Sequence, residues 1–157
     1  MLDTGDEAPD FTAPLANSDV ETFTLSDHLE EAPIVLAFFP AAFTGTCTTE
    51  MCTFRDQLSN FEDVGATVYG ISVDLPFTLN EFRRQNDLNF GLISDERREL
   101  IDAYDVETTF SPLDMRVAQR SVFVVDGNGT VTYVWRGSAK DEPDYDAVRE
   151  AAAEARR

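Results

Sequence analysis

Residues 33–52 of the chain read PIVLAFFPAAFTGTCTTEMC, and this stretch decides the fold. It opens with an apolar run over residues 33–39, which is typical of a β-strand buried on both faces of a sheet. After Pro40, small and hydroxyl-bearing residues lead to Cys47. From Thr48 onward the apolar residues are spaced by three and four, as on one face of a helix. The stretch therefore predicts a strand, a turn and a helix with Cys47 in its first turn.

Strand and helix patterns alternate along the rest of the chain. They predict strands at 66–73, 90–94, 121–125 and 130–135, and helices at 76–86, at 97–104 with Asp95 as its cap, and from Pro143 onward. In the 76–86 helix we expect Phe77, Leu79 or the nearby Phe82 to face inward. Residues 105–118 show no clear period, and we expect a loop there. The first 30 residues suggest a small extra β-hairpin.

This order of elements predicts an α/β protein with a central mixed sheet, flanked by helices and extended by the N-terminal hairpin. We expect one domain over residues 1–157, because no repeat, low-complexity segment or linker interrupts the pattern. In open α/β sheets, functional sites gather at the carboxyl ends of the strands. Cys47 follows such an end.

Composition narrows the classes of partner. The chain has 30 Asp and Glu against 12 Lys and Arg, a formal net charge of −18, which repels nucleic acid and anionic membranes. No apolar run approaches the roughly 18–20 residues that span a bilayer. The acidic N-terminus lacks the pattern of a signal peptide. We therefore expect a cytoplasmic protein with neither nucleic acid nor a membrane as partner.

The two cysteines indicate redox or catalytic chemistry rather than a structural role. At the start of a helix, Cys47 would face unpaired N–H groups and the positive end of the macrodipole, and both favour the thiolate. Arg120 and Arg55 are the candidate cations. His28, the only histidine, lies in an acidic stretch and is expected at the surface, so a Cys–His protease is weakly supported. Two cysteines and one distant histidine cannot form a tetrahedral zinc site.

The spacing of Cys47 and Cys52 also constrains a disulfide between them. In one regular helix their Cα atoms would lie about 8–9 Å apart. Because bridging needs Cα atoms within ~7 Å, the first turns of the helix must unwind before the bond can form. The alternative is that Cys52 is a small buried apolar residue on the flank of the helix.

The pattern Pro40-x-x-x-Thr44-x-x-Cys47 resembles the active-site signature of the peroxiredoxins, thiol peroxidases with a thioredoxin-like fold. The resemblance covers nearly the whole chain and includes the segments 5–11, 71–74, 92–95 and 120–126. The spacing of the cysteines is similar to the bacterioferritin comigratory protein (PrxQ-type) subgroup. The amino-acid sequence of residues 38–47 is more similar to AhpE-like members, which lack the second cysteine.

The resemblance implies a role for each matching residue. Cys47 would be the peroxidatic thiolate, Thr44 would hydrogen-bond thiolate and peroxide, and Arg120 would stabilise the thiolate and the developing charge. Pro40 would shield the site. Glu50 would support the arginine, or would only complement the helix dipole as an acid near the N-terminus.

The resemblance further implies that Cys52 resolves the oxidised Cys47 as an intramolecular disulfide, which a thioredoxin-like or other dithiol reductant recycles. No metal or organic cofactor is expected, and the protein would be a monomer or a homodimer. A one-Cys enzyme resolved by an external thiol is the main alternative. A disulfide reductase would normally carry C-x-x-C, and a copper chaperone would need converging ligands, so both are weaker.

The acidic composition predicts a salt-dependent fold, as in a halophilic microbe, because salt screens the repulsion among like charges. We expect the melting temperature to be higher in molar KCl than in low KCl, as measured by thermal unfolding. A melting temperature indifferent to KCl would contradict this interpretation.

Overall fold

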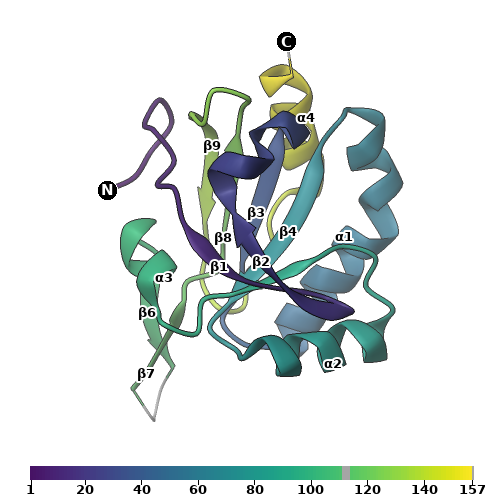
Figure 1. Cartoon of the computed structure of the whole chain (residues 1–157), viewed down its shortest axis with the longest axis vertical. Helices are drawn as coiled ribbons and strands as arrows, with labels where there is room; N and C mark the ends of the chain where they lie inside the picture. The colour runs from purple at the N-terminus through teal and green to yellow at the C-terminus, as the bar shows by residue number, and fades with distance from the viewer. Residues whose placement is uncertain (111–113, 157) are drawn as a thin grey trace.

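The computed structural model describes residues 1–110 and 114–156, and its centre is a seven-stranded mixed sheet with helices on both faces (Figure 1). The strands are β1 (Thr12–Asn17), β2 (Asp19–Thr24), β3 (Ile34–Phe38), β4 (Thr67–Ser72), β5 (Leu92–Ser94), β8 (Ser121–Val125) and β9 (Val131–Arg136). Their order is β2-β1-β5-β4-β3-β8-β9, and only the β5–β4 and β4–β3 pairs are parallel. The predicted α/β fold with a mixed sheet is confirmed.

The helices cover the two faces of the sheet unequally. Helices α1 (Gly45–Asp63), α2 (Pro76–Asn86) and α4 (Tyr145–Ala155) pack on one face. The short helix α3 (Glu99–Ala103) and the 3₁₀ helix η1 (Leu25–Glu31) contribute to the core on the other face. In β3, Val35 and Ala37 join the first core, and Ile34 and Leu36 join the second. Both faces of β3 are therefore buried, which explains its continuous apolar run.

Helix α1 forms because its apolar residues make one stripe. Met51, Phe54, Leu58 and Phe61 are all buried against the sheet. The helix begins at Gly45, three residues before the apolar period becomes visible at Thr48. The predicted placement of Cys47 in the first turn is confirmed.

The loop predicted over residues 105–118 is wrong for most of its length. Strands β6 (Glu107–Phe110) and β7 (Met115–Ala118) form a two-stranded antiparallel sheet, while residues 111–113 lie outside the described residues. The first three side chains of β6 are exposed, so this strand has no apolar face from which a period could be detected.

Several finer expectations are settled by burial. Leu79 and Phe82 of α2 face the core of the protein, whereas Phe77 is 72% exposed. His28 is not a free surface residue, since its half-buried ring stacks on Phe23 with centroids 4.3 Å apart and bonds Glu31. Asp95 accepts hydrogen bonds from the Leu100 and Ile101 amides in the first turn of α3, although the helix begins at Glu99, later than predicted, and its N-cap residue is Arg98.

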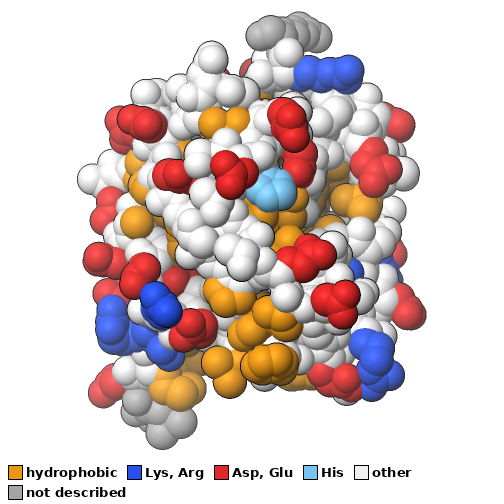
Figure 2. Space-filling model, in the orientation of Figure 1, with side chains coloured by type: hydrophobic (Ala, Val, Ile, Leu, Met, Phe, Trp, Pro, Cys, Tyr) orange, Lys and Arg blue, Asp and Glu red, His pale blue; other side chains and the backbone are white. Residues whose placement is uncertain are grey.

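The N-terminal hairpin is confirmed as β1 and β2, and it joins the main sheet because β1 pairs with β5. No helix within residues 1–110 and 114–156 is long and apolar enough to cross a membrane. Acidic side chains are scattered over the face of the molecule shown in Figure 2. Among the described residues, the charged side chains classed as buried are Glu50, Asp95 and Arg120. Two of these three lie beside Cys47.

Candidate active site

The register of two neighbouring strands brings Arg120 to Cys47. In the antiparallel pairing of β3 with β8, Phe38 lies opposite Ser121. The carboxyl end of β3, from which the chain continues to α1, therefore lies beside the amino end of β8. Arg120 immediately precedes β8, and Cys47 lies in the first turn of α1. Two residues separated by 73 positions thus meet at the carboxyl end of β3.

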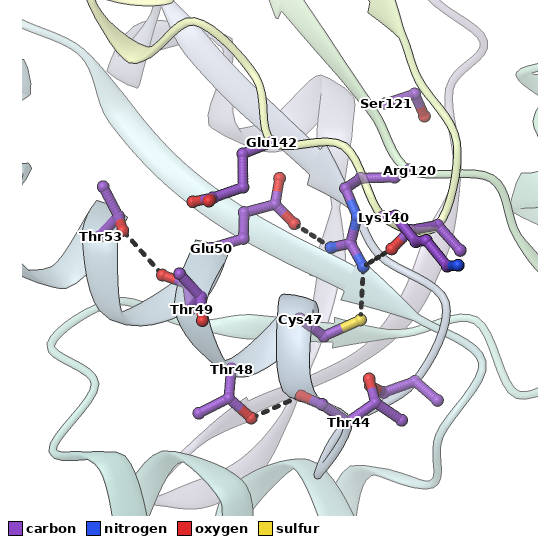
Figure 3. A network of polar contacts seen from close by, with 12 residues as sticks. Thr44, Cys47, Thr48, Thr49, Glu50, Thr53, Arg120, Ser121, Lys140 and Glu142 are labelled. Carbon is purple, nitrogen blue, oxygen red and sulfur yellow. Dashed lines mark hydrogen bonds and ion pairs between the residues drawn. The ribbon is translucent and has the colours of Figure 1, made fainter.

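The guanidinium of Arg120 contacts three acceptors (Figure 3). Its Nη2 donates to Cys47 Sγ at 3.0 Å and to the carbonyl oxygen of Ala139 at 3.0 Å. Its Nη1 donates to Glu50 Oε1 at 2.7 Å. Arg120 and Cys47 are each 1% exposed and Glu50 is fully buried. Hydrogen bonds from an ionised donor are stronger than neutral ones, so the arginine presents a fixed positive charge to the Cys47 sulfur.

The start of α1 adds a second stabilising influence. The first backbone bond of the helix runs from the Thr48 amide to the Thr44 carbonyl oxygen at 2.9 Å. The amides of residues 45–47 precede this bond, so they have no partner within the helix. Cys47 is the third residue of α1, close to these amides and to the positive end of the macrodipole. The Arg120 guanidinium and the N-terminus of α1 therefore both place positive charge near the Cys47 sulfur.

Burial shifts the pKa of Glu50 in this group of side chains. Removal from water raises the pKa of Glu50 from 4.5 to about 7, although Arg120 opposes the shift and Glu142 adds to it. Burial also opposes the charge of Arg120, but Glu50 and Cys47 outweigh it and raise the pKa of the guanidinium. Within the part of the chain that the structure describes, Oε2 of Glu50 and Nε of Arg120 are buried without a hydrogen-bond partner. Glu50 therefore changes charge near neutral pH while Arg120 stays charged.

Thr44 and Pro40 occupy the turn between β3 and α1. The Thr44 hydroxyl donates to the carbonyl oxygen of Ala41 at 2.8 Å, not to Cys47, and the Thr44 carbonyl oxygen accepts from the Thr48 hydroxyl at 2.8 Å. The hydrogen bond that the resemblance predicts between the Thr44 hydroxyl and the thiolate is not made in this structure, and it would require the hydroxyl to turn. Pro40 is buried at the start of the turn.

Sequence reasoning missed Asp74, which holds this turn in place. Its Oδ2 accepts from the Ala42 amide at 2.8 Å and from the Ser72 hydroxyl at 2.6 Å. The next residue, Phe43, has a φ of 66°, a left-handed conformation that costs about 1–2 kcal/mol for a residue with a side chain. Asp74 follows the carboxyl end of β4, the neighbour of β3, and that position was the available signal.

Cys52 does not lie beside Cys47. Both residues belong to the continuous helix α1, and both are free thiols. A separation of five residues in a helix rotates the second side chain by about 140° relative to the first. Accordingly, Cys52 Sγ lies 3.7 Å from Asn86 Oδ1 of α2. Arg55, the other candidate cation, also contacts Asn86.

Comparison with known proteins places this site in a family. The model of the AhpC/TSA family matches residues 4–134. A putative peroxiredoxin of Mycobacterium tuberculosis is 39% identical over 132 residues, which are 83% of this chain and 82% of that protein. Peroxiredoxin Bcp of Bacillus subtilis is 34% identical over 138 residues, 86% of this chain and 85% of that protein.

Solved structures agree. Peroxidoxin BcpB from Mycobacterium tuberculosis has a TM-score of 0.83 at 29% identity and covers 100% of this chain and 99% of its own. A mutant of PrxQ from Xylella fastidiosa has a TM-score of 0.84 at 26% identity and covers 99% of both chains. The thioredoxin-like fold implied by the sequence is thereby confirmed. The chain belongs to the AhpC/TSA family and is a peroxiredoxin of the Bcp/PrxQ type, a thiol-dependent peroxidase.

Proposed function

We propose that Cys47 is the peroxidatic residue and that Arg120, Glu50, Thr44 and Pro40 build the site around it. The observation that carries the proposal is the 3.0 Å contact between Arg120 Nη2 and Cys47 Sγ, both buried at the start of a helix. A sulfur in this setting is nucleophilic, because the thiolate is the reactive form and is stabilised here by fixed positive charge.

In the first step the Cys47 thiolate attacks the terminal oxygen of the peroxide. An S–O bond forms and the O–O bond breaks, so the sulfur is oxidised to a sulfenic acid and the peroxide is reduced. The leaving oxygen takes up a proton and departs as water or an alcohol. Arg120 and the free amides of residues 45–47 stabilise the negative charge that develops on this oxygen.

In the second step Cys52 attacks the sulfenic sulfur of Cys47. An S–S bond forms and the hydroxyl leaves as water. Because Cys52 faces α2 in the folded helix, the first turns of α1 must open before this step. A dithiol reductant, such as a thioredoxin-like protein, then exchanges with the disulfide and restores both thiols. A cytoplasmic location, one domain and a monomeric or homodimeric state remain predictions.

Mass spectrometry after one equivalent of peroxide tests the role of Cys52. We expect an intramolecular disulfide between Cys47 and Cys52 in the native chain, and a sulfenic or overoxidised Cys47 in the Cys52→Ser variant. An oxidised Cys47 beside a persistently free Cys52 in the native chain would instead support a one-Cys enzyme resolved by an external thiol.

Replacing Arg120 by lysine tests the arginine. Lysine keeps the charge but cannot bond Cys47, Glu50 and Ala139 together, so we expect peroxide to react with Cys47 more slowly by roughly 10²–10³-fold. Stopped-flow kinetics of the reduced protein measures this rate. Arg136→Lys, a change on the adjacent strand β9 away from Cys47, is the matched control. A near-native rate in Arg120→Lys would show that the arginine is not needed.

The Glu50→Gln variant tests the buried carboxyl. The native state holds the Glu50 proton up to about pH 7, whereas the unfolded chain releases it near 4.5. The native state therefore binds more protons between these values, and its free energy of unfolding falls as pH rises. Between these pH values we expect the free energy of unfolding of the wild type to fall, relative to that of Glu50→Gln, by at most about 3 kcal/mol. Denaturant unfolding at several pH values measures the difference.

Glu62→Gln, at an exposed position of the same helix, is the control and should follow the wild type. Parallel pH profiles for Glu50→Gln and the wild type would refute the assignment of a raised pKa to Glu50.

A further inference from the structure

A polar cluster joins α1 to α2 on the side of α1 that faces away from Cys47. It consists of Arg55 on α1 and Asn86 at the end of α2, and Cys52 lies against it. All three side chains are partly buried. Of the three, only Cys52 takes part in the reaction proposed above. We call Arg55 and Asn86 together the α1–α2 latch.

Arg55 links the middle of α1 to the C-terminus of α2. Its Nη1 donates to the carbonyl oxygen of Asn86 at 2.6 Å. Asn86 is the last residue of α2, so its carbonyl lacks a partner within the helix and lies at the negative end of the macrodipole. Nε of Arg55 donates to Asp56 at 2.9 Å, which orients the guanidinium. The Arg55 guanidinium therefore provides a hydrogen-bond donor to a carbonyl oxygen that has no partner within α2.

Asn86 holds the thiol directly. Its Nδ2 donates to the carbonyl oxygen of Phe82 at 2.9 Å, and this bond turns Oδ1 toward Cys52 Sγ at 3.7 Å. Helix α2 is itself anchored, because Leu79 and Phe82 are fully buried in the core. Cys52 therefore contacts a helix that can stay in place while the first turns of α1 open.

We propose that the α1–α2 latch positions Cys52 away from Cys47 and sets the rate at which the disulfide forms. The proposal depends on the function assigned above to Cys52. In the folded helix the two thiols face different elements, since Cys47 contacts Arg120 and Cys52 contacts Asn86. Opening the first turns of α1 frees Cys47, but Cys52 stays in place until its contact with Asn86 breaks.

The latch controls a competition at the sulfenic acid. Attack by Cys52 forms the S–S bond and releases water, whereas a second peroxide oxidises Cys47 further to the sulfinic acid. A tight latch prolongs the life of the sulfenic acid and favours the second outcome. Arg55 and Asn86 are in this sense positioning residues, which act on the reaction only through Cys52.

Rapid-quench mass spectrometry of the reduced full chain with peroxide tests the proposal, because alkylation of free thiols separates the sulfenic, disulfide and sulfinic forms. We expect Arg55→Ala to form the disulfide roughly tenfold faster than the wild type, as for the loss of one charge-assisted hydrogen bond. At high peroxide it should accumulate less sulfinic acid. Asn86→Ala should act in the same direction, and Arg55→Lys should recover part of the native rate.

Two controls separate the latch from general loss of stability. Arg84→Ala removes an exposed arginine of α2 that bonds only Glu81 in this structure, and should leave the partition unchanged. Leu100→Ala destabilises the core on the opposite face of the sheet and should not speed the disulfide. Disulfide formation in Arg55→Ala that is no faster than in the wild type, or an equal acceleration in Leu100→Ala, would overturn the latch. Absence of the disulfide in the wild type would overturn the role of Cys52 instead.

Discussion

The buried contact of Arg120 with Glu50 and Cys47 is the constraint on which the rest of the site depends. A guanidinium that is 1% exposed has lost its water and must find acceptors inside the protein. It finds one carboxylate and one sulfur on the same turn of α1, and a carbonyl oxygen after β9. Three segments are held together as a result, and the charge assigned to the proposed chemistry also orders the structure around it.

Much of this arrangement is predictable from the sequence, because it depends on local patterns. Three local patterns are reproduced by the structure. They are the apolar run before Pro40, the helical spacing of apolar residues in α1 and the turn residues between β8 and β9. The resemblance predicted Cys47 and Arg120 as neighbours, whereas for Glu50 it left open whether the carboxyl supports the arginine or only complements the helix dipole. The protonation behaviour of Glu50 could not have been inferred in the same way, since its raised pKa depends on complete burial.

Other features depend on what lies opposite a residue in space. Asp74 bonds Ala42 because β4 ends beside β3, and no pattern within either segment indicates this contact. The helical offset of Cys52 predicts that it points away from Cys47, but not that α2 and Asn86 lie there. Strands β6 and β7 pair mainly with each other and expose much of their surface, so they lack the apolar alternation that marks a strand.

The pairing of Phe38 with Ser121 carries a consequence for how such a site can be altered. Successive residues of a strand point to opposite faces, so a slip of β8 by one residue would exchange its two faces. Arg120 would then be carried away from Cys47 together with every apolar side chain of β8, all of which are buried. A misaligned arginine is therefore coupled to a disrupted core. The register that places Arg120 beside Cys47 is therefore the same register that packs the core, so a shift of β8 would disturb both at once.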